Sequence, residues 1–173
     1  MMYKVMKAWT TEVGYEAKLT VNTRGTINGY VRAPDDHKAY GMDYYVWDMK
    51  LEEFKDWTIE KVATQEKVNN IEVHGGLTYA RKNWPMEENN DWIFGFDTAH
   101  SGDSGNLALA IEHFGDSDEK VMELTEAYKI WTLWPGDTHK DETYVTEQCE
   151  SLAKQLKEID EQDKRSKEIT DEN

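Results

Sequence analysis

The chain has little cysteine, little proline and no long hydrophobic run. Cys149 is its only cysteine, which excludes an intramolecular disulfide and a zinc site built from several cysteines. No apolar run approaches the ~20 residues that a membrane-spanning helix needs. The first residues also lack the apolar segment that is typical of a signal peptide. We therefore expect no membrane association and a cytoplasmic location.

Positive charge is also scarce. There are 20 Lys and Arg residues against 35 Asp and Glu residues, so the formal net charge is −15. No stretch holds more than two adjacent basic residues, and an acidic protein repels nucleic-acid phosphates. Direct nucleic-acid binding is therefore not expected. The acidity has two interpretations: it serves solubility alone, or it imitates the charge of DNA and so occupies a host protein that binds nucleic acids.

Aromatic residues, in contrast, are plentiful. They make up 12% of the 173 residues and include seven Trp and nine Tyr. Disordered chains are poor in aromatic residues, so the composition excludes global disorder. The length is that of one domain with a hydrophobic core. We expect a single domain over residues 1–160 and a frayed or disordered acidic tail over residues 161–173.

The N-terminal part of the chain predicts β structure. Residues 9–17 alternate between apolar and polar, residues 18–21 continue this strand, and residues 26–32 form a second one. The turn at residues 22–25 contains Gly25 and joins the two strands into a hairpin.

The rest of the chain adds further strands and then helices. We expect a short helix or the start of a strand within 48–66, strands at 71–79 and 91–97, loops at 81–90 and 101–105, a helix at 117–130 that Ser117 caps, and a strand at 131–134. Strands early and helices late predict an α+β fold with a mixed or antiparallel sheet.

The C-terminal helix has the clearest pattern. Five apolar residues step by 4, 3, 4 and 3 along one face: Val145, Cys149, Leu152, Leu156 and Ile159. Asp141 or Thr143 can cap the start of this helix. We expect it to pack on the sheet, with Cys149 as a core residue and not a nucleophile.

Residues suited to chemistry gather in two short segments. The first contributes His74, Gly75, Gly76 and Thr78, and the second contributes Asp97, His100, Gly102 and Asp103. Each segment lies at a predicted strand end, where glycines leave backbone N–H groups open to a ligand. If the two strands pair, the eight residues converge on one ligand-binding pocket, with His74, Asp97 and His100 as catalytic candidates. His, Asp and Gly together suit a divalent metal, acid–base chemistry or a phosphate.

Each of these residues also has a purely structural interpretation. His74 can hydrogen-bond a carbonyl, the two glycines can form a turn or bulge, and Asp97 can cap the turn that follows it. His100 and Asp103 can form an orienting pair within a loop. His37, His113 and His139 fit surface or capping roles. The motifs of phosphate loops, dinucleotide-binding folds, zinc proteases and serine hydrolases are all missing from the sequence.

Two of these segments carry a resemblance to a known family. Residues 74–79 read HGGLTY, and residues 95–103 read GFDTAHSGD. With residues 28–44 and the helix at 144–156, they resemble a family of phage and prophage proteins without an established activity. The resemblance implies a viral accessory origin, with the host cytoplasm as location, and a fold built around the His74, Asp97 and His100 segment. Thr98 stands where this family has cysteine, so the resemblance supports no thiol mechanism.

Three hypotheses about function follow. The first is an accessory protein, with a role against host defence, that binds a nucleotide-like or phosphorylated small molecule through the His/Asp/Gly pocket. The second is a metal-assisted phosphoester hydrolase that uses the same residues with a divalent metal as cofactor. The third is an acidic inhibitor of a host nucleic-acid-binding protein. The partner is accordingly a small molecule or a host defence protein, and a homo-oligomer is compatible with all three.

Overall fold

The computed structural model describes residues 2–44, 67–68, 71–85, 87–88, 90–131 and 136–171. The helix or strand expected within residues 48–66 lies outside these ranges, and so do residues 132–134 of the strand expected at 131–134. Trp131, the first residue of that expected strand, is helical instead.

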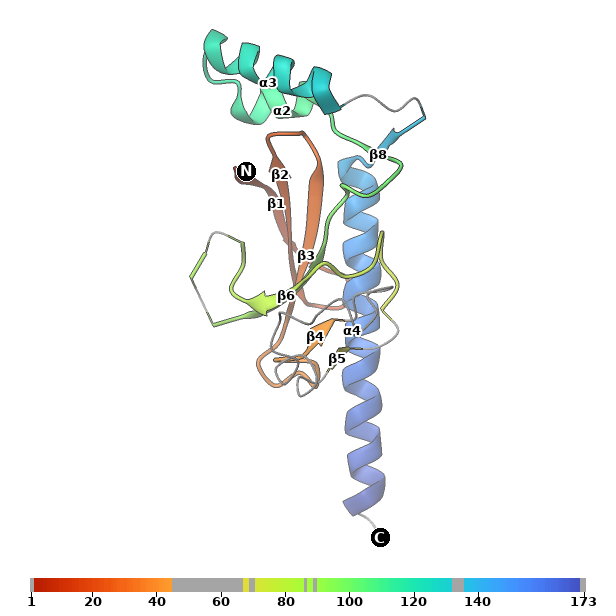
Figure 1. Ribbon diagram of the computed structural model, residues 1–173. Helices are drawn as coiled ribbons and strands as arrows, with labels where there is room; N and C mark the ends of the chain where they lie inside the picture. The colour runs from red at the N-terminus through yellow and green to blue at the C-terminus, as the bar shows by residue number, and fades with distance from the viewer. Residues whose placement is uncertain are drawn as a thin grey trace, which may run out of the picture.

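The described elements form an α+β fold in one domain, as the sequence predicts (Figure 1). In chain order they are β1 (Tyr3–Thr10), β2 (Glu16–Asn22), β3 (Ile27–Ala33), β4 (Asp43–Tyr44), β5 (Lys67–Val68), β6 (Tyr79–Lys82), β7 (Trp92–Phe96), β8 (Asp103–Ser104), α2 (Leu107–Phe114), α3 (Asp118–Trp131), β9 (Thr138–His139) and α4 (Glu142–Asp171). No helix in the described part of the chain has the length and hydrophobicity needed to cross a membrane.

The main sheet has five strands in the order β1-β2-β3-β7-β6, and every neighbouring pair is antiparallel. The predicted hairpin is β2 and β3. The Asn22 side chain shapes its turn by accepting a hydrogen bond from the backbone of Arg24 at 2.8 Å. The alternating stretch at 9–17 is not one strand. Strand β1 ends at Thr10, and Gly14 at a φ of +92° lies in the turn that leads into β2.

The prediction of a strand over residues 71–79 is mostly wrong. Only Tyr79 is in a strand, and β6 continues into Arg81 and Lys82, which the sequence places in a loop. Residues 71–78 stay outside the sheet because helix α4 takes two of their backbone N–H groups. Glu72 donates to Gln155 Oε1 and His74 donates to Gln148 Oε1. The pairing on which the predicted pocket depends is nevertheless present, since β6 pairs with β7.

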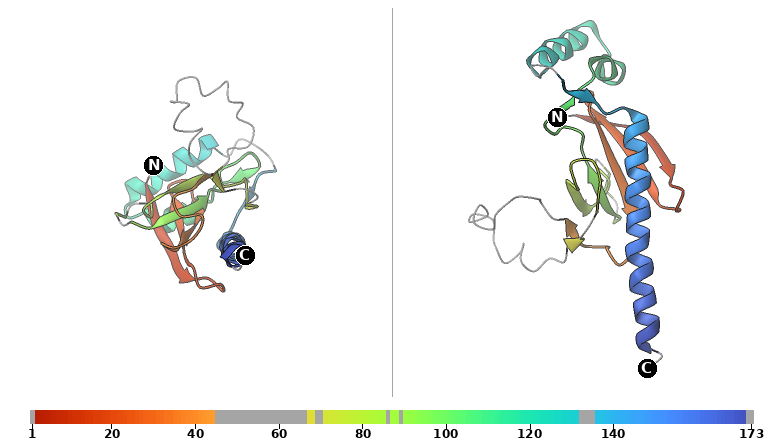
Figure 2. Two further views of the ribbon diagram at one scale, coloured as in Figure 1. Left: turned by 90° about the horizontal axis from the view of Figure 1, so that it is seen from below. Right: turned by 90° about the vertical axis from the view of Figure 1, so that its right-hand side faces the viewer.

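Helix α4 covers one face of the sheet (Figures 1 and 2). Asp141 caps its start by accepting a hydrogen bond from the backbone of Tyr144 at 2.8 Å. Four residues of its predicted apolar face are fully buried: Val145, Cys149, Leu152 and Leu156. Burial of each leucine contributes about 1.5–3 kcal/mol. The helix approaches β3 closely at Gly29, where an added Cβ would lie 2.6 Å from Cys149 Sγ.

The C-terminal part of α4 corrects the expected tail. The helix continues through Asp171, past the end of the sheet, so the described residues after position 160 are helical and not frayed. Six of the eleven residues from 161 to 171 are the strong helix formers Glu, Gln, Lys or Arg. Ion pairs also support the helix, such as Lys164 with Asp160, which are four positions apart with 2.6 Å between charged atoms. A polar helix of this kind needs no apolar face to form.

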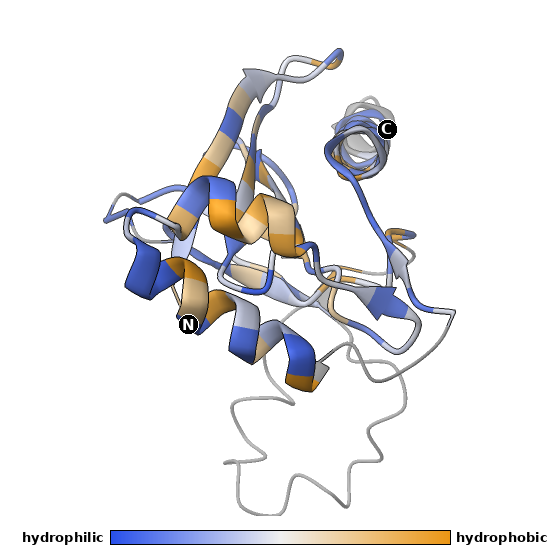
Figure 3. Cartoon of the chain, turned by 90° about the horizontal axis from the view of Figure 1, so that it is seen from above, coloured by the Kyte–Doolittle hydropathy of each residue, from blue (hydrophilic) through white to orange (hydrophobic). Residues whose placement is uncertain are grey.

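Helices α2 and α3 lie across the end of the sheet, near the β2–β3 turn (Figure 3). Helix α2 is not predicted by the sequence. The Asn106 side chain caps it by accepting from the backbone of Leu109 at 3.1 Å, and its Ala110 and Phe114 pack with Val21. Helix α3 is confirmed with its cap, because Ser117 Oγ accepts from the backbone of Lys120 at 3.2 Å.

Candidate functional site

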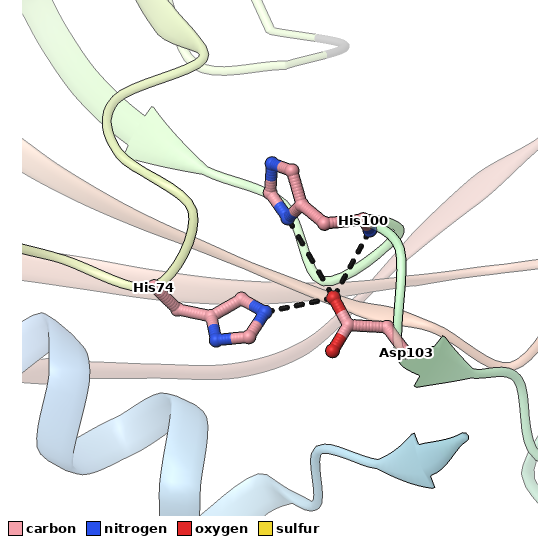
Figure 4. Close-up of side chains that lie close together, drawn as sticks. All are labelled: His74, His100 and Asp103. Atoms are coloured by element: carbon pink, nitrogen blue, oxygen red, sulfur yellow. Dashed lines mark hydrogen bonds and ion pairs between the residues drawn. The ribbon is translucent and has the colours of Figure 1, made fainter. Parts of the chain in front are cut away.

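Two loops bring three side chains together at one end of the sheet (Figure 4). His74 lies in the loop before β6, while His100 and Asp103 lie in the segment after β7. Tyr79 of β6 pairs with Gly95 of the antiparallel strand β7, so the loop that enters β6 and the loop that leaves β7 meet at the same end of the sheet. We call these three side chains the His74–His100–Asp103 cluster.

Asp103 is the centre of the cluster, with only 3% of its side chain exposed. Its Oδ2 lies 2.7 Å from His74 Nε2 and accepts a hydrogen bond from the backbone of His100 at 3.0 Å. Its Oδ1 lies 3.6 Å from Lys140 Nζ. Burial by itself raises the pKa of this carboxyl, but these hydrogen bonds and the nearby positive charges outweigh burial and lower it. Asp103 is therefore an anion held among donors.

His74 is fixed on both sides of its ring. Nε2 contacts Asp103, and Nδ1 lies 3.1 Å from the hydroxyl of Tyr144 on α4. In the neutral ring these contacts require that Nε2–H donates to Asp103 and that Nδ1 accepts from Tyr144. Gln148, one helical turn further along α4, accepts from the His74 backbone at 2.9 Å. Helix α4 therefore positions both the ring and the backbone of His74.

His100 lies against Gly75 and is the more accessible histidine, with 32% of its side chain exposed. An added Cβ at Gly75 would lie 2.2 Å from His100 Cε1, and Gly75 has a φ of +65°. Only glycine fits this position without displacing the ring. His100 Nδ1 is buried and has no hydrogen-bond partner among the described residues. It lies 3.6 Å from Asp103 Oδ2 and 3.8 Å from Asp97 Oδ1.

Asp97 and Thr98 have clear structural roles beside the cluster. Asp97 Oδ1 accepts from the backbone of Ala99 at 3.0 Å, which is the turn-capping role, and 33% of its side chain is exposed. Thr98 is buried. Its hydroxyl donates to the Ile27 carbonyl at 2.9 Å and accepts from the Ile27 backbone at 3.3 Å. Thr98 thus ties the end of β7 to the start of β3.

Two of the predicted site residues, Gly76 and Thr78, do not offer their backbone N–H groups to a ligand. Gly76 N–H donates to the Val73 carbonyl and Thr78 N–H donates to the Gly95 carbonyl, each at 2.9 Å. These two groups are used within the fold and do not face a phosphate. Gly102, at a φ of +90°, permits the turn that leads into β8 and so places Asp103.

The sequence misses three neighbours of the cluster: Lys140, Tyr144 and Gln148. Tyr144 and Gln148 are four residues apart, a spacing that places them on one face of a helix. That signal is present in the sequence, but it points to the site only once α4 is known to pass the His74 loop. Lys140 Nζ lies 5.7 Å from the Tyr144 ring centre as well as beside Asp103.

His37 is neither a surface residue nor a simple cap. It is buried, its Nε2 lies 2.8 Å from the Leu156 carbonyl, and its Nδ1 accepts from the backbone of Ala39 at 2.9 Å. This histidine joins the loop after β3 to α4. Burial lowers its pKa, because the charged form would lose hydration and the acceptor at Nδ1.

The arrangement of the cluster suits a metal ion. One ligand atom from each of the three side chains lies within 4.8 Å of the other two. Two imidazoles and one carboxylate are a common ligand set for zinc and other divalent transition metals. The Tyr144 hydroxyl on the second nitrogen of His74 is the kind of outer contact that orients a metal-binding imidazole. Without a metal, the same contacts form a hydrogen-bonded Asp–His pair.

Comparison of the chain with protein-family models, with curated proteins and with solved structures finds no match.

Proposed function

We propose that this protein binds a divalent transition metal at the His74–His100–Asp103 cluster and uses it to hydrolyse a phosphoester of a small molecule. The single observation that carries the proposal is the convergence of three ligand atoms from two separate loops within 4.8 Å. Catalytic metal sites typically have three protein ligands and leave one position for water.

The surroundings of the cluster support a reaction as well as metal binding. His100 is partly exposed, so a substrate can contact this side chain, while its Nδ1 is buried beside Asp103. A metal there would lower the pKa of a bound water and polarise a phosphoryl oxygen. In the hydrolysis, the water oxygen would join phosphorus as the ester P–O bond breaks, and the proton that the water releases would pass to the leaving oxygen. Lys140 supplies a positive charge near the phosphoryl group.

The position of Asp103 favours this proposal over a phosphate bound directly by the two histidines. A buried carboxylate at the centre of the cluster repels a phosphate placed at the same point, whereas it attracts a cation. The viral accessory origin and the role against host defence rest on the resemblance of four segments alone and stay predictions. The same holds for the acidic-inhibitor hypothesis, which needs carboxylates rather than His74.

Metal binding is tested by titration calorimetry of the metal-free protein with Zn²⁺. We expect one ion per chain in the wild type and at least a tenfold weaker affinity in His74→Ala and His100→Ala. His113→Ala, on helix α2, is the matched control and keeps wild-type affinity. Equal affinity in all four proteins, or no binding in the wild type, contradicts the proposed site.

Turnover is tested separately with bis(p-nitrophenyl) phosphate and p-nitrophenyl phosphate. We expect hydrolysis that needs the metal and disappears in His100→Ala. Tight metal binding without hydrolysis of these esters or of a nucleotide panel contradicts the hydrolase and leaves a metal-binding protein.

A further inference from the structure

A cavity of about 320 Å³ lies on the face of the sheet opposite α4. Its lining combines aromatic and charged residues, among them Tyr3, Arg24, Asn28, Tyr30, Tyr79 and Asp97. None of the three cluster residues lines it. The cavity is therefore a second candidate site, next to the cluster but separate from it.

Strand alternation explains which side chains reach this face. On β3, Ile27 and Val31 belong to the core beneath α4, so Asn28 and Tyr30 point to the other side. The Tyr30 ring lies over Gly95, where an added Cβ would be 2.4 Å from Tyr30 Cδ1. Gly95 thus provides the space that the ring occupies.

Two tyrosines form an aromatic wall of the cavity. Tyr30 and Tyr79 meet edge to face, with ring centres 5.3 Å apart and planes at 85°. Tyr79 is held in place because its hydroxyl donates to the Asn83 carbonyl at 2.9 Å. Fixed aromatic side chains of this kind suit a flat ring, which contacts them at little cost in conformational freedom.

The side-chain oxygen of Asn28 is a hydrogen-bond acceptor that no donor among the described residues contacts. Its side chain is 7% exposed, and its Nδ2 donates to the Tyr30 hydroxyl at 3.3 Å. Its Oδ1 is buried with no hydrogen-bond partner among the described residues. A buried amide oxygen left unpaired is unfavourable, so the position is suited to a ligand that brings an N–H donor.

Charged groups lie at the end of the cavity near the β2–β3 turn. Arg24 belongs to that turn, and the bonds between Thr98 and Ile27 hold Asp97 and Ala99 close to it. A guanidinium suits a phosphate, and a half-exposed carboxylate suits the hydroxyls of a sugar. Asp97 also lies 3.8 Å from His100 Nδ1, so this end of the cavity borders the cluster.

We propose that the cavity binds a nucleotide, with the base against the wall that the two tyrosines form, a base N–H on Asn28 Oδ1 and the phosphate at Arg24. The inference that a nucleotide is the substrate of the hydrolase rests on the proposed function. As a binding site, it needs no metal, because none of the cluster residues lines the cavity.

The test is calorimetry with AMP, GMP, CMP and UMP and with the four nucleosides, in the presence of EDTA. We expect at least one nucleotide to bind, at least tenfold more tightly than its nucleoside. Asn28→Leu keeps the side-chain size and removes the unpaired oxygen. This variant should bind that nucleotide at least tenfold more weakly, with an unchanged or higher melting temperature of the protein. Absence of binding by all eight compounds overturns the proposal.

The phosphate contact is tested with Arg24→Gln. This variant should bind the nucleotide and the nucleoside equally, while the matched charge control Arg165→Gln, exposed on α4 and outside the cavity lining, keeps the wild-type preference. Binding that survives Asn28→Leu but is lost in His100→Ala places the ligand at the cluster and overturns the proposal. Nucleotide binding in EDTA by a protein that takes up no Zn²⁺ contradicts the proposed function alone.

Discussion

Gly75→Ala tests whether the contact between Gly75 and His100 shapes the cluster. The new Cβ would lie 2.2 Å from His100 Cε1 and 2.4 Å from Nε2, whereas non-bonded carbon atoms are most stable about 3.5–4.0 Å apart. The ring or the loop must therefore move. Alanine at a left-handed φ costs about 1–2 kcal/mol, and the overpacking adds roughly 1–3 kcal/mol. We expect the free energy of unfolding to fall by about 2–5 kcal/mol.

Gly14→Ala separates the two contributions. Gly14 has a φ of +92°, but nothing lies within 4 Å of its added Cβ, so this variant carries only the backbone cost. Urea unfolding of both variants gives the steric contribution as the difference between them. If Gly75→Ala is no more destabilising than Gly14→Ala, the close contact with His100 is refuted.

The double variant Gly75→Ala/His100→Ala gives a second check. The three atoms nearest to the added Cβ all belong to the His100 ring, so removal of the ring relieves the overlap. Gly75→Ala should then cost about 1–2 kcal/mol in the His100→Ala background, which is the backbone cost alone. In the wild-type background, Gly75→Ala should also weaken Zn²⁺ binding although all three ligands remain.

Three further predictions concern the α4 side of the fold. Burial lowers the pKa of His37, so the neutral ring stabilises the fold fully above the ordinary pKa of 6.5, and this stabilisation is lost as pH falls from there towards the folded pKa. In urea unfolding, the free energy of unfolding of His37→Gln should therefore fall less between pH 7.5 and 5.5 than that of the wild type. Burial tends to raise the pKa of Asp160, but Lys164 and a backbone donor outweigh burial and lower it below the ordinary 3.8. The free energy of unfolding of Asp160→Asn should therefore fall less with decreasing pH, below about pH 4, than that of the wild type. Gly29→Ala should lower the free energy of unfolding by about 1–3 kcal/mol, because its Cβ would meet Cys149 Sγ and the Phe96 ring at 2.6 Å.

Each of these three predictions has an outcome that contradicts it. Equal pH dependence of wild type and His37→Gln would mean that His37 becomes charged in the folded protein. An unchanged acid transition in Asp160→Asn would mean that the Lys164 contact has no effect on folding. Gly29→Ala should be less damaging when combined with Cys149→Ala, and independent effects of the two changes would argue against the close approach of α4 to β3.

Local patterns predicted the elements whose own residues determine them. The step of apolar residues from Val145 to Leu156 specifies which face of α4 is buried, and Asn22 and Gly25 specify the β2–β3 turn. In each case the signal lies within a few residues.

Contacts between distant segments were not predictable in this way. Residues 71–74 have the composition of a strand, but their backbone donors go to Gln148 and Gln155, more than 70 positions away. Helix α2 depends on Asn106 as a cap and on packing against Val21 of β2. The cavity on the face opposite α4 is lined by residues of several separate segments, among them Tyr3, Tyr30 and Tyr79, and no single segment shows that pattern.

The burial of Cys149 makes the thiol a natural reporter of helix–sheet separation. Burial raises its pKa to about 12, and a thiol reacts with alkylating or disulfide reagents as the thiolate. At neutral pH the folded protein therefore has almost no reactive sulfur, and Cys149 is the only cysteine of the chain. The rate at which a thiol reagent labels the wild-type protein will measure how often α4 leaves the sheet, and a cysteine introduced at an exposed position can be labelled without interference from the native one.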